Sequence, residues 1–179
     1  MKNFTIWALS QFDSLVNALA KNSRVQEDFK VDDASGNSCN AEFITDLLED
    51  LETGANYAQM DNISLGNFCF IYDKKTRKTS IINIRSNKFV TTYCSLNDFM
   101  SAKVGFGVCW AKYNNVERPK FPVKKRLSEL KPHDIFRLYT DRKYEFVGTT
   151  SDGKYIGYDS KDTGKKFYSF LEGDCTVWE

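Results

Sequence analysis

The sequence predicts an α+β fold in two parts, with helices and strands mixed up to about residue 116 and strands alone from about residue 127. Three observations support this expectation. Apolar residues recur at helical spacing in the first part, and β-rich runs joined by turns follow them. In the last part, short β-rich runs are separated by Asp-Gly and Thr-Gly turns at roughly ten-residue intervals, a pattern typical of a small antiparallel barrel of about five strands.

The N-terminal segment is expected to begin with a strand and continue with a helix. Residues 4–9 are apolar and β-rich and predict the strand. Ser10 with Asp13 resembles a capping box, and apolar residues at helical spacing then predict a helix over 11–21. A short strand is expected over 29–33, before the turn residues that follow it.

The clearest helix is predicted near residues 42–52, with Gly54 as its C-terminal stop. Its apolar stripe consists of Phe43, Ile44, Leu47, Leu48 and Leu51. Its outer face is acidic and consists of Glu42, Asp46, Glu49, Asp50 and Glu52.

A hairpin and a third strand are expected next. The β-rich runs 67–72 and 79–84 form the hairpin, and four of the six residues in its loop, 73–78, are cationic. The run 88–93 predicts a further strand.

Ser95, with Asp98 three residues later, predicts the start of a helix over 96–113. Gly105 and Gly107 lie inside this helix, and each costs about 1 kcal/mol relative to alanine. We therefore expect either that another backbone approaches closely there or that the helix bends.

These patterns divide the chain into an α+β domain over 1–116, a basic linker over 117–126 and the barrel over 127–179. Five strands are expected in the barrel, at Asp134–Tyr139, Lys143–Gly148, Lys154–Tyr158, Lys166–Leu171 and Cys175–Trp178.

Composition indicates a globular protein, because 41% of the residues are hydrophobic and 15% are aromatic. No apolar run reaches the length of a membrane span, and the N-terminus lacks the pattern of a signal peptide, so a cytoplasmic location is expected. The five cysteines are widely spaced without a Cys-x-x-Cys motif, which favours free buried thiols over disulfides or a zinc site.

Positive charge is concentrated in the middle of the chain. Residues 1–62 carry 4 Lys/Arg against 11 Asp/Glu (net −7), residues 63–127 carry 13 against 3 (net +10), and residues 128–179 carry 8 against 10 (net −2). A basic block between acidic ends is typical of a surface for nucleic acid or an acidic partner. The alternative is a solvated face whose charges cluster only in the sequence.

The cations of this block are the predicted nucleic-acid-binding residues, because Lys and Arg neutralise phosphates without reading bases. They are Lys74, Lys75, Arg77, Lys78, Arg85, Lys88, Lys103, Lys112, Arg118, Lys120, Lys124, Lys125 and Arg126. Tyr93, Tyr113 and Phe121 are candidates for stacking on unpaired bases, although aromatic residues more often belong to a core.

Catalytic chemistry is poorly supplied, so a catalytic role is left open and a non-enzymatic role is favoured. His133 is the only histidine and lies in a turn. Asp32, Asp33 and Asp46, with Glu27 and Asp28 nearby, could hold a divalent ion, but acids in such turns are more often solvated. No phosphate-binding glycine motif is present, and no cofactor or metal is expected.

Two stretches resemble segments of small proteins from phages and mobile elements of Gram-positive bacteria. The first, KFVTTYCSLNDF at 88–99 continuing to KVGFGVCWA at 103–111, reads as a strand, a helix cap and a glycine-containing helix. The second, LSELKPHDIF at 127–136, is similar to segments that lead into small SH3-like barrels, where glycine more often stands at the position of His133. The resemblance implies an SH3-like barrel for the C-terminal domain.

The same resemblance implies a host-interaction protein such as a type II anti-CRISPR, a Cas9 inhibitor that acts on Cas9 or its guide RNA. The expected function is therefore non-enzymatic binding of RNA or a ribonucleoprotein through residues 63–127. Two alternatives stay open. One is a metal-dependent ribonuclease, and the other is a protein–protein interaction module that works through the acidic helix face.

Overall fold

The computed structural model describes residues 2–29, 40–161 and 166–178. The chain divides into two compact units, unit 1 (Met1–Arg118) and unit 2 (Pro119–Glu179). Within the described residues, no helix combines the length and the apolar character needed to cross a membrane.

Unit 1 is a mixed helix and sheet structure whose four strands form an antiparallel meander in the order β1-β2-β3-β4. Its described elements are α1 (Lys2–Ala20), α2 (Ser23–Asp28), α3 (Ala41–Ala58), β1 (Met60–Leu65), β2 (Phe68–Asp73), β3 (Lys78–Asn83), β4 (Lys88–Tyr93) and α4 (Ala102–Tyr113). The predicted hairpin and third strand are confirmed as β2, β3 and β4.

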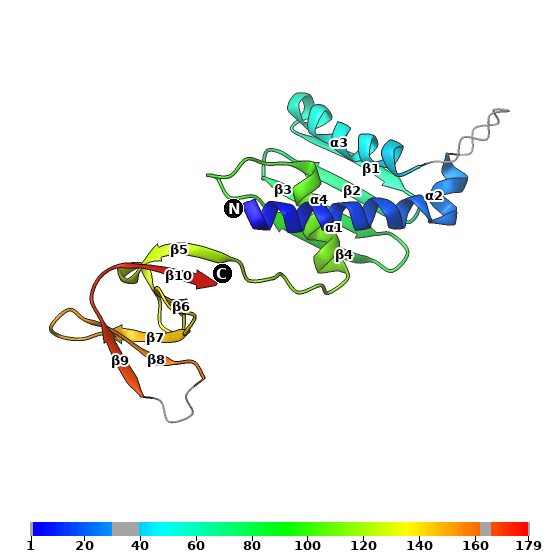
Figure 1. The fold of residues 1–179 in the computed structure, drawn as a ribbon. Coiled ribbons are helices and arrows are strands. Elements are labelled where there is room, and N and C mark those ends of the chain that lie inside the picture. The colour runs from blue at the N-terminus through cyan, green and yellow to red at the C-terminus, as the bar shows by residue number, and fades with distance from the viewer. Residues whose placement is uncertain (1, 30–39, 162–165, 179) are drawn as a thin grey trace. The chain divides into compact units, whose positions relative to one another are not determined.

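Helix α4 is buried between the sheet and α1, and Figure 1 shows α1 lying across it. A Cβ atom at Gly107 would collide with the carbonyl oxygen of Ala8 in α1, and one at Gly105 would collide with the side chain of Thr79 in β3. These glycines lie on opposite sides of the helix, because successive helical residues are about 100° apart. The expectation of a close backbone approach is thus confirmed at Gly107.

Helix α1 corrects the predicted strand over 4–9. The whole of Lys2–Ala20 is helical, and its buried face consists of Ala8, Phe12, Leu15, Val16 and Leu19. The aromatic and β-branched residues near the N-terminus favour a strand locally, but packing of Ala8 and Phe12 against α4 overrides that preference.

Helix α3 is confirmed, but it continues past Gly54 to Ala58 and ends at Gln59, whose φ is 67°. A Cβ at Gly54 would collide with the side chain of Asp61, so the glycine provides space for β1 rather than a helix stop. The expected strand over 29–33 is not tested as a whole, because residues 30–33 lie outside the described residues and Phe29 is the C-cap of α2.

Helix α4 begins at Ala102 and not near Ser95 as predicted. Ser101 occupies the N-cap without a side-chain capping bond, and the Ala102 N–H instead donates to the carboxylate of Glu52 in α3. The start of α4 is therefore set by a contact from a distant helix, and residues 94–101 form a loop.

Unit 2 contains one antiparallel sheet in the order β5-β10-β6-β7-β8-β9. Its elements are β5 (Pro122–Arg126), the 3-10 helix η1 (Leu127–Glu129), β6 (Ile135–Arg137), β7 (Tyr144–Thr149), β8 (Tyr155–Asp159), β9 (Phe167–Phe170) and β10 (Asp174–Trp178). The five predicted strands are present, and β5 lies within the segment that was expected to be a linker.

The core of unit 2 is formed by Leu127, Leu130, Phe136, Tyr144, Phe146, Cys175 and Val177. β5 and β9 are the two edges of its sheet, and among the described residues they do not pair with each other. The sheet is therefore not closed into a barrel, and the predicted SH3-like barrel is not confirmed.

Candidate nucleic-acid interface

The β1–β4 sheet has two different faces. The face toward the helices carries Leu65, Phe70, Tyr72 and Ile81 and joins the core of unit 1. By strand alternation and register, the other face consists of the rows Met60–Asp73–Lys78–Tyr93, Asn62–Ile71–Ser80–Thr91 and Ser64–Cys69–Ile82–Phe89. None of these twelve described residues belongs to the hydrophobic core, and we call this surface the open face.

Two aromatic side chains dominate the open face on its edge strand β4. Phe89 is 70% exposed and Tyr93 is 68% exposed. They are four residues apart on one strand, a separation of about 13 Å. Lys78 Nζ lies 5.2 Å from the centre of the Tyr93 ring, and between the aromatics the Ser80 and Thr91 hydroxyls are hydrogen-bonded at 2.8 Å.

Exposed cations lie at both ends of the open face. Lys74 and Lys75 are in the β2–β3 turn beside the row that contains Tyr93, and Arg85 is in the β3–β4 turn beside the row that contains Phe89. The Lys74 amine donates to the side-chain oxygen of Asn56. The open face thus combines aromatic, apolar and polar side chains, with positive charge in the turns at its two ends.

The β2–β3 turn is fixed by Asp73. Its carboxylate accepts hydrogen bonds from the Thr76 N–H at 3.0 Å and the Thr76 hydroxyl at 2.5 Å. These bonds, the hydroxyl's first, lower the pKa of Asp73 below its usual value. The turn therefore holds the backbone that positions Lys74 and Lys75.

Arg77 has a structural role in the loop that follows β4. Its guanidinium donates to the carbonyl oxygens of Cys94 at 3.3 Å, Ser95 at 2.8 Å and Asp98 at 2.6 Å. Its backbone is in the left-handed region, with φ of 57°. This predicted phosphate contact instead fixes the 94–98 loop.

Four further predicted contacts are engaged within unit 1. Lys103 forms an ion pair with Glu49 at 2.7 Å, and Lys112 donates to the Thr91 carbonyl at 3.1 Å. Lys88 lies 4.3 Å from the centre of the Tyr113 ring and donates to the Tyr113 carbonyl, and Arg118 lies 4.6 Å from the Phe4 ring. The structure therefore does not gather the nine unit 1 cations into one patch.

Of the three aromatics proposed from the sequence, Tyr93 lies on the open face. Tyr113 packs against Phe68 and Trp110 and accepts a hydrogen bond from Asn83 at 2.8 Å. Phe121 is half-buried in unit 2. Sequence reasoning missed Phe89, although it has the same strand parity as Tyr93 in the run 88–93.

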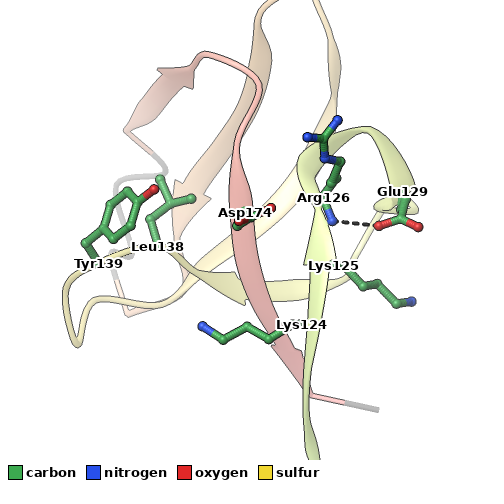
Figure 2. A pocket seen from close by; sticks show the side chains of 7 residues that line it. All are labelled: Lys124, Lys125, Arg126, Glu129, Leu138, Tyr139 and Asp174. Carbon is green, nitrogen blue, oxygen red and sulfur yellow. Dashed lines mark hydrogen bonds between the residues drawn. The ribbon is translucent and has the colours of Figure 1, made fainter.

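The other four predicted cations, Lys120, Lys124, Lys125 and Arg126, belong to unit 2. The last three lie on β5 and line a pocket of about 490 Å³ together with Glu129, Leu138, Tyr139 and Asp174. Figure 2 shows Lys124 and Lys125 projecting in opposite directions from β5. The same view marks the hydrogen bond from the Arg126 N–H to the Glu129 carboxylate, which is 2.6 Å long.

The acidic residues predicted as metal ligands are only partly described by the structure, and those predicted to contact a protein lie on α3. Asp32 and Asp33 lie outside the described residues, and Asp46 lies on the exposed side of α3. Within the described part of the chain, no group of three or more His, Cys, Asp or Glu side chains is placed to hold a metal ion. On α3, Glu49 and Glu52 contact α4, whereas Glu42, Asp46 and Asp50 are exposed.

His133 lies in the turn before β6, with φ of 75°. Its ring nitrogen Nδ1 is 2.7 Å from the Glu145 carboxylate, and its side chain is exposed. This contact joins the turn to β7, which contains Glu145.

Comparison with protein-family models, with curated proteins and with solved structures finds no match to this chain.

Proposed function

We propose that this protein binds unpaired RNA on the open face of the β1–β4 sheet. The observation that carries the proposal is the pair of exposed aromatics, Phe89 and Tyr93, on one strand of a sheet whose opposite face alone joins the core. Aromatic rings on a sheet can stack on splayed bases, as they do in several single-strand-binding folds.

The polar and charged groups around the aromatics suit a single strand. Ser80 and Thr91 offer hydroxyls to base edges between the two rings. Lys75 and Arg85, at opposite ends of the face, are placed to neutralise phosphates, and Lys78 lies against Tyr93. Stacking contributes about 1–3 kcal/mol per base, so two aromatics would provide much of the binding free energy.

A titration with labelled single-stranded RNA at about 50 and about 200 mM salt tests the proposal. Phe89→Ala with Tyr93→Ala should weaken binding by at least tenfold, because two stacking contacts are lost. Lys75→Gln with Arg85→Gln should reduce the salt dependence of binding while leaving the stacking contacts in place.

The matched control is Tyr57→Ala with Ile6→Ala, which removes two exposed apolar side chains from α3 and α1. This control should bind RNA like the wild type. Equal loss in both double variants, or no binding by the wild type at low salt, would refute the open face as the RNA site.

A second feature favours a ribonucleoprotein over RNA alone as the partner. The loop fixed by Arg77 exposes Leu96 (87%) and Phe99 (95%) next to the end of the sheet that carries Tyr93. A preorganised loop with exposed apolar side chains suits insertion into a groove of a protein. We therefore propose that the RNA is presented by a protein, as a guide RNA is by Cas9, in line with the resemblance to anti-CRISPR inhibitors.

The wild type and a Leu96→Ser, Phe99→Ser variant can be titrated against guide RNA alone and against its complex with Cas9. The variant should match the wild type on RNA alone and bind the complex more weakly. Equal affinity of the wild type for both samples would argue against a protein contact through this loop.

For unit 2 we propose a relationship to SH3-like barrels in spite of its open sheet. The meander β6-β7-β8-β9 is followed by a strand, β10, that returns to pair with β6. Such a return is expected of a small, strongly curled sheet of short strands.

A further inference from the structure

Trp178, near the C-terminal end of unit 2, lies against two cations, Arg137 of β6 and Lys143, which precedes β7. Lys143 Nζ is 4.4 Å from the centre of the indole, and the Arg137 guanidinium carbon is 5.3 Å from it. Trp178 is half-buried, whereas Lys143 is exposed and the Arg137 side chain is 41% exposed. Both charged ends therefore reach solvent from positions fixed by the ring.

The strand register adds a third cation to this surface. Thr176 of β10 pairs with Lys124 of β5 on one side and with Arg137 of β6 on the other. Paired residues share a face, so Lys124 and Arg137 point the same way from positions about 10 Å apart. The pairing of Phe136 with Tyr144 places Lys143 opposite Arg137 on the same face.

Acidic groups only partly neutralise the three cations Lys124, Arg137 and Lys143. Arg137 Nη1 is 3.5 Å from Asp141, a fully exposed residue whose ion pair contributes little. Asp174 lines the pocket beside Lys124, and Glu145 is bonded to His133. Like charges on adjacent strands repel each other and destabilise the folded sheet. A cluster of positive charge that is kept in spite of this cost is expected of a surface that binds an anion.

We propose that Lys124, Arg137 and Lys143, arranged around Trp178, form a second site for the phosphodiester backbone of the bound RNA. The proposal rests on RNA as the ligand of the protein, but it uses residues of unit 2 and none of the open face. Lys124 also borders the pocket of Figure 2, so the row continues into a hollow lined by Arg126 and Tyr139. Sequence reasoning included Lys124 but not Arg137 or Lys143, because these two lie in a segment whose net charge is negative.

The test uses the full chain and labelled single-stranded RNA over a range of salt concentrations. A triple variant, Lys124→Gln, Arg137→Gln and Lys143→Gln, should reduce the slope of log affinity against log salt by about 2, since each phosphate contact to a single strand contributes about 0.7. The control is Lys131→Gln, Lys154→Gln and Lys161→Gln, which removes the same charge from exposed positions elsewhere in unit 2. The control should keep the wild-type slope, and equal slopes in the two triple variants would overturn the proposal.

The Phe89→Ala, Tyr93→Ala variant, measured in the same titration, separates this proposal from the function of the open face. If only the unit 2 triple variant loses affinity for RNA, the second site is supported and the open face is refuted as the RNA site. If the wild type does not bind RNA, inorganic polyphosphate serves as a probe with phosphates and no bases. Polyphosphate binding that the unit 2 triple variant loses would retain a phosphate site, and no binding to either probe would refute both proposals.

Discussion

At the scale of single residues, Arg77 shows how charge in a sequence differs from charge on a surface. Its position in a basic hairpin loop predicts a phosphate contact, whereas its guanidinium donates to three carbonyl oxygens of the 94–98 loop. Whether an arginine side chain points to solvent or back to a loop depends on the conformation of its turn, and here Arg77 has a φ of 57°. The composition of the loop does not determine that conformation.

Arg77→Lys should therefore destabilise the protein by about 2 kcal/mol, because an ammonium group cannot reach three divergent carbonyls. The amides of residues 94–98 should also exchange faster with solvent in this variant. Lys75→Gln, in the same turn, is the control and should leave the free energy of unfolding within about 0.5 kcal/mol. Unchanged stability and unchanged amide exchange in Arg77→Lys would contradict the structural role.

Cys109 is a second residue whose environment can be tested, through the burial and the pKa of its thiol. Its thiol is fully buried, donates to the Thr79 carbonyl at 3.1 Å, and has its pKa raised by burial from 9.0 to about 12. The unfolded thiol ionises above pH 9 while the folded thiol stays neutral, so this group's contribution to stability is lost as pH rises from 9 toward 12.

Alkylation at mildly alkaline pH should accordingly modify the half-buried Cys69 and Cys94 in the native protein and spare Cys109, as read by mass spectrometry. Denaturant should make all three reactive. Rapid native modification of Cys109 would show that its site opens far more easily than the packing of α4 implies.

At the scale of elements, the sequence predicted the strands β2, β3 and β4 better than it predicted the ends of the helices. The runs that became β2, β3 and β4 are rich in β-branched and aromatic residues and are bounded by turn residues, so local chemistry suffices. The start of α4 depends on Glu52, fifty residues earlier in the chain, and the helical state of 4–9 depends on packing against α4. Such tertiary contacts leave no local signal.

The crossing of α1 and α4 is tested by Gly107→Ala. Alanine normally favours a helix by about 1 kcal/mol, but here its Cβ would collide with the Ala8 backbone, so we expect a net loss of about 1–3 kcal/mol. The control is Gly54→Ala in α3, where the obstacle is the Asp61 side chain, which can rotate away. Chemical denaturation should therefore give a much lower free energy of unfolding for Gly107→Ala than for Gly54→Ala. The reverse order would contradict this helix crossing.

At the scale of the whole molecule, each unit has its own hydrophobic core. Phe70 is fully buried in unit 1 and Phe136 is fully buried in unit 2. Phe136→Ala should cost about 3–5 kcal/mol and lower the unfolding transition of unit 2, while near-native exchange protection persists in β2 and β3. Simultaneous loss of protection in both units would show that their folding is coupled.

The candidate site was only partly predictable at this scale. The basic block and Tyr93 were evident in the sequence, yet the open face follows from which side of the sheet α3 and α4 cover. Phe89 and Val90 are adjacent and both suited to a core, and only the helix packing decides that Val90 is covered while Phe89 is exposed. The cation row around Trp178 likewise requires the return of β10 to β6.

The most direct test of the open face is photo-crosslinking of the full chain to single-stranded RNA, followed by mass spectrometry of the crosslinked peptides. We expect adducts on Phe89 and Tyr93, which disappear when unlabelled RNA competes, and none on Tyr57, an aromatic that is 87% exposed on α3. Adducts on Tyr57 at the same yield, or adducts that avoid residues 88–93 while RNA is bound, would contradict it.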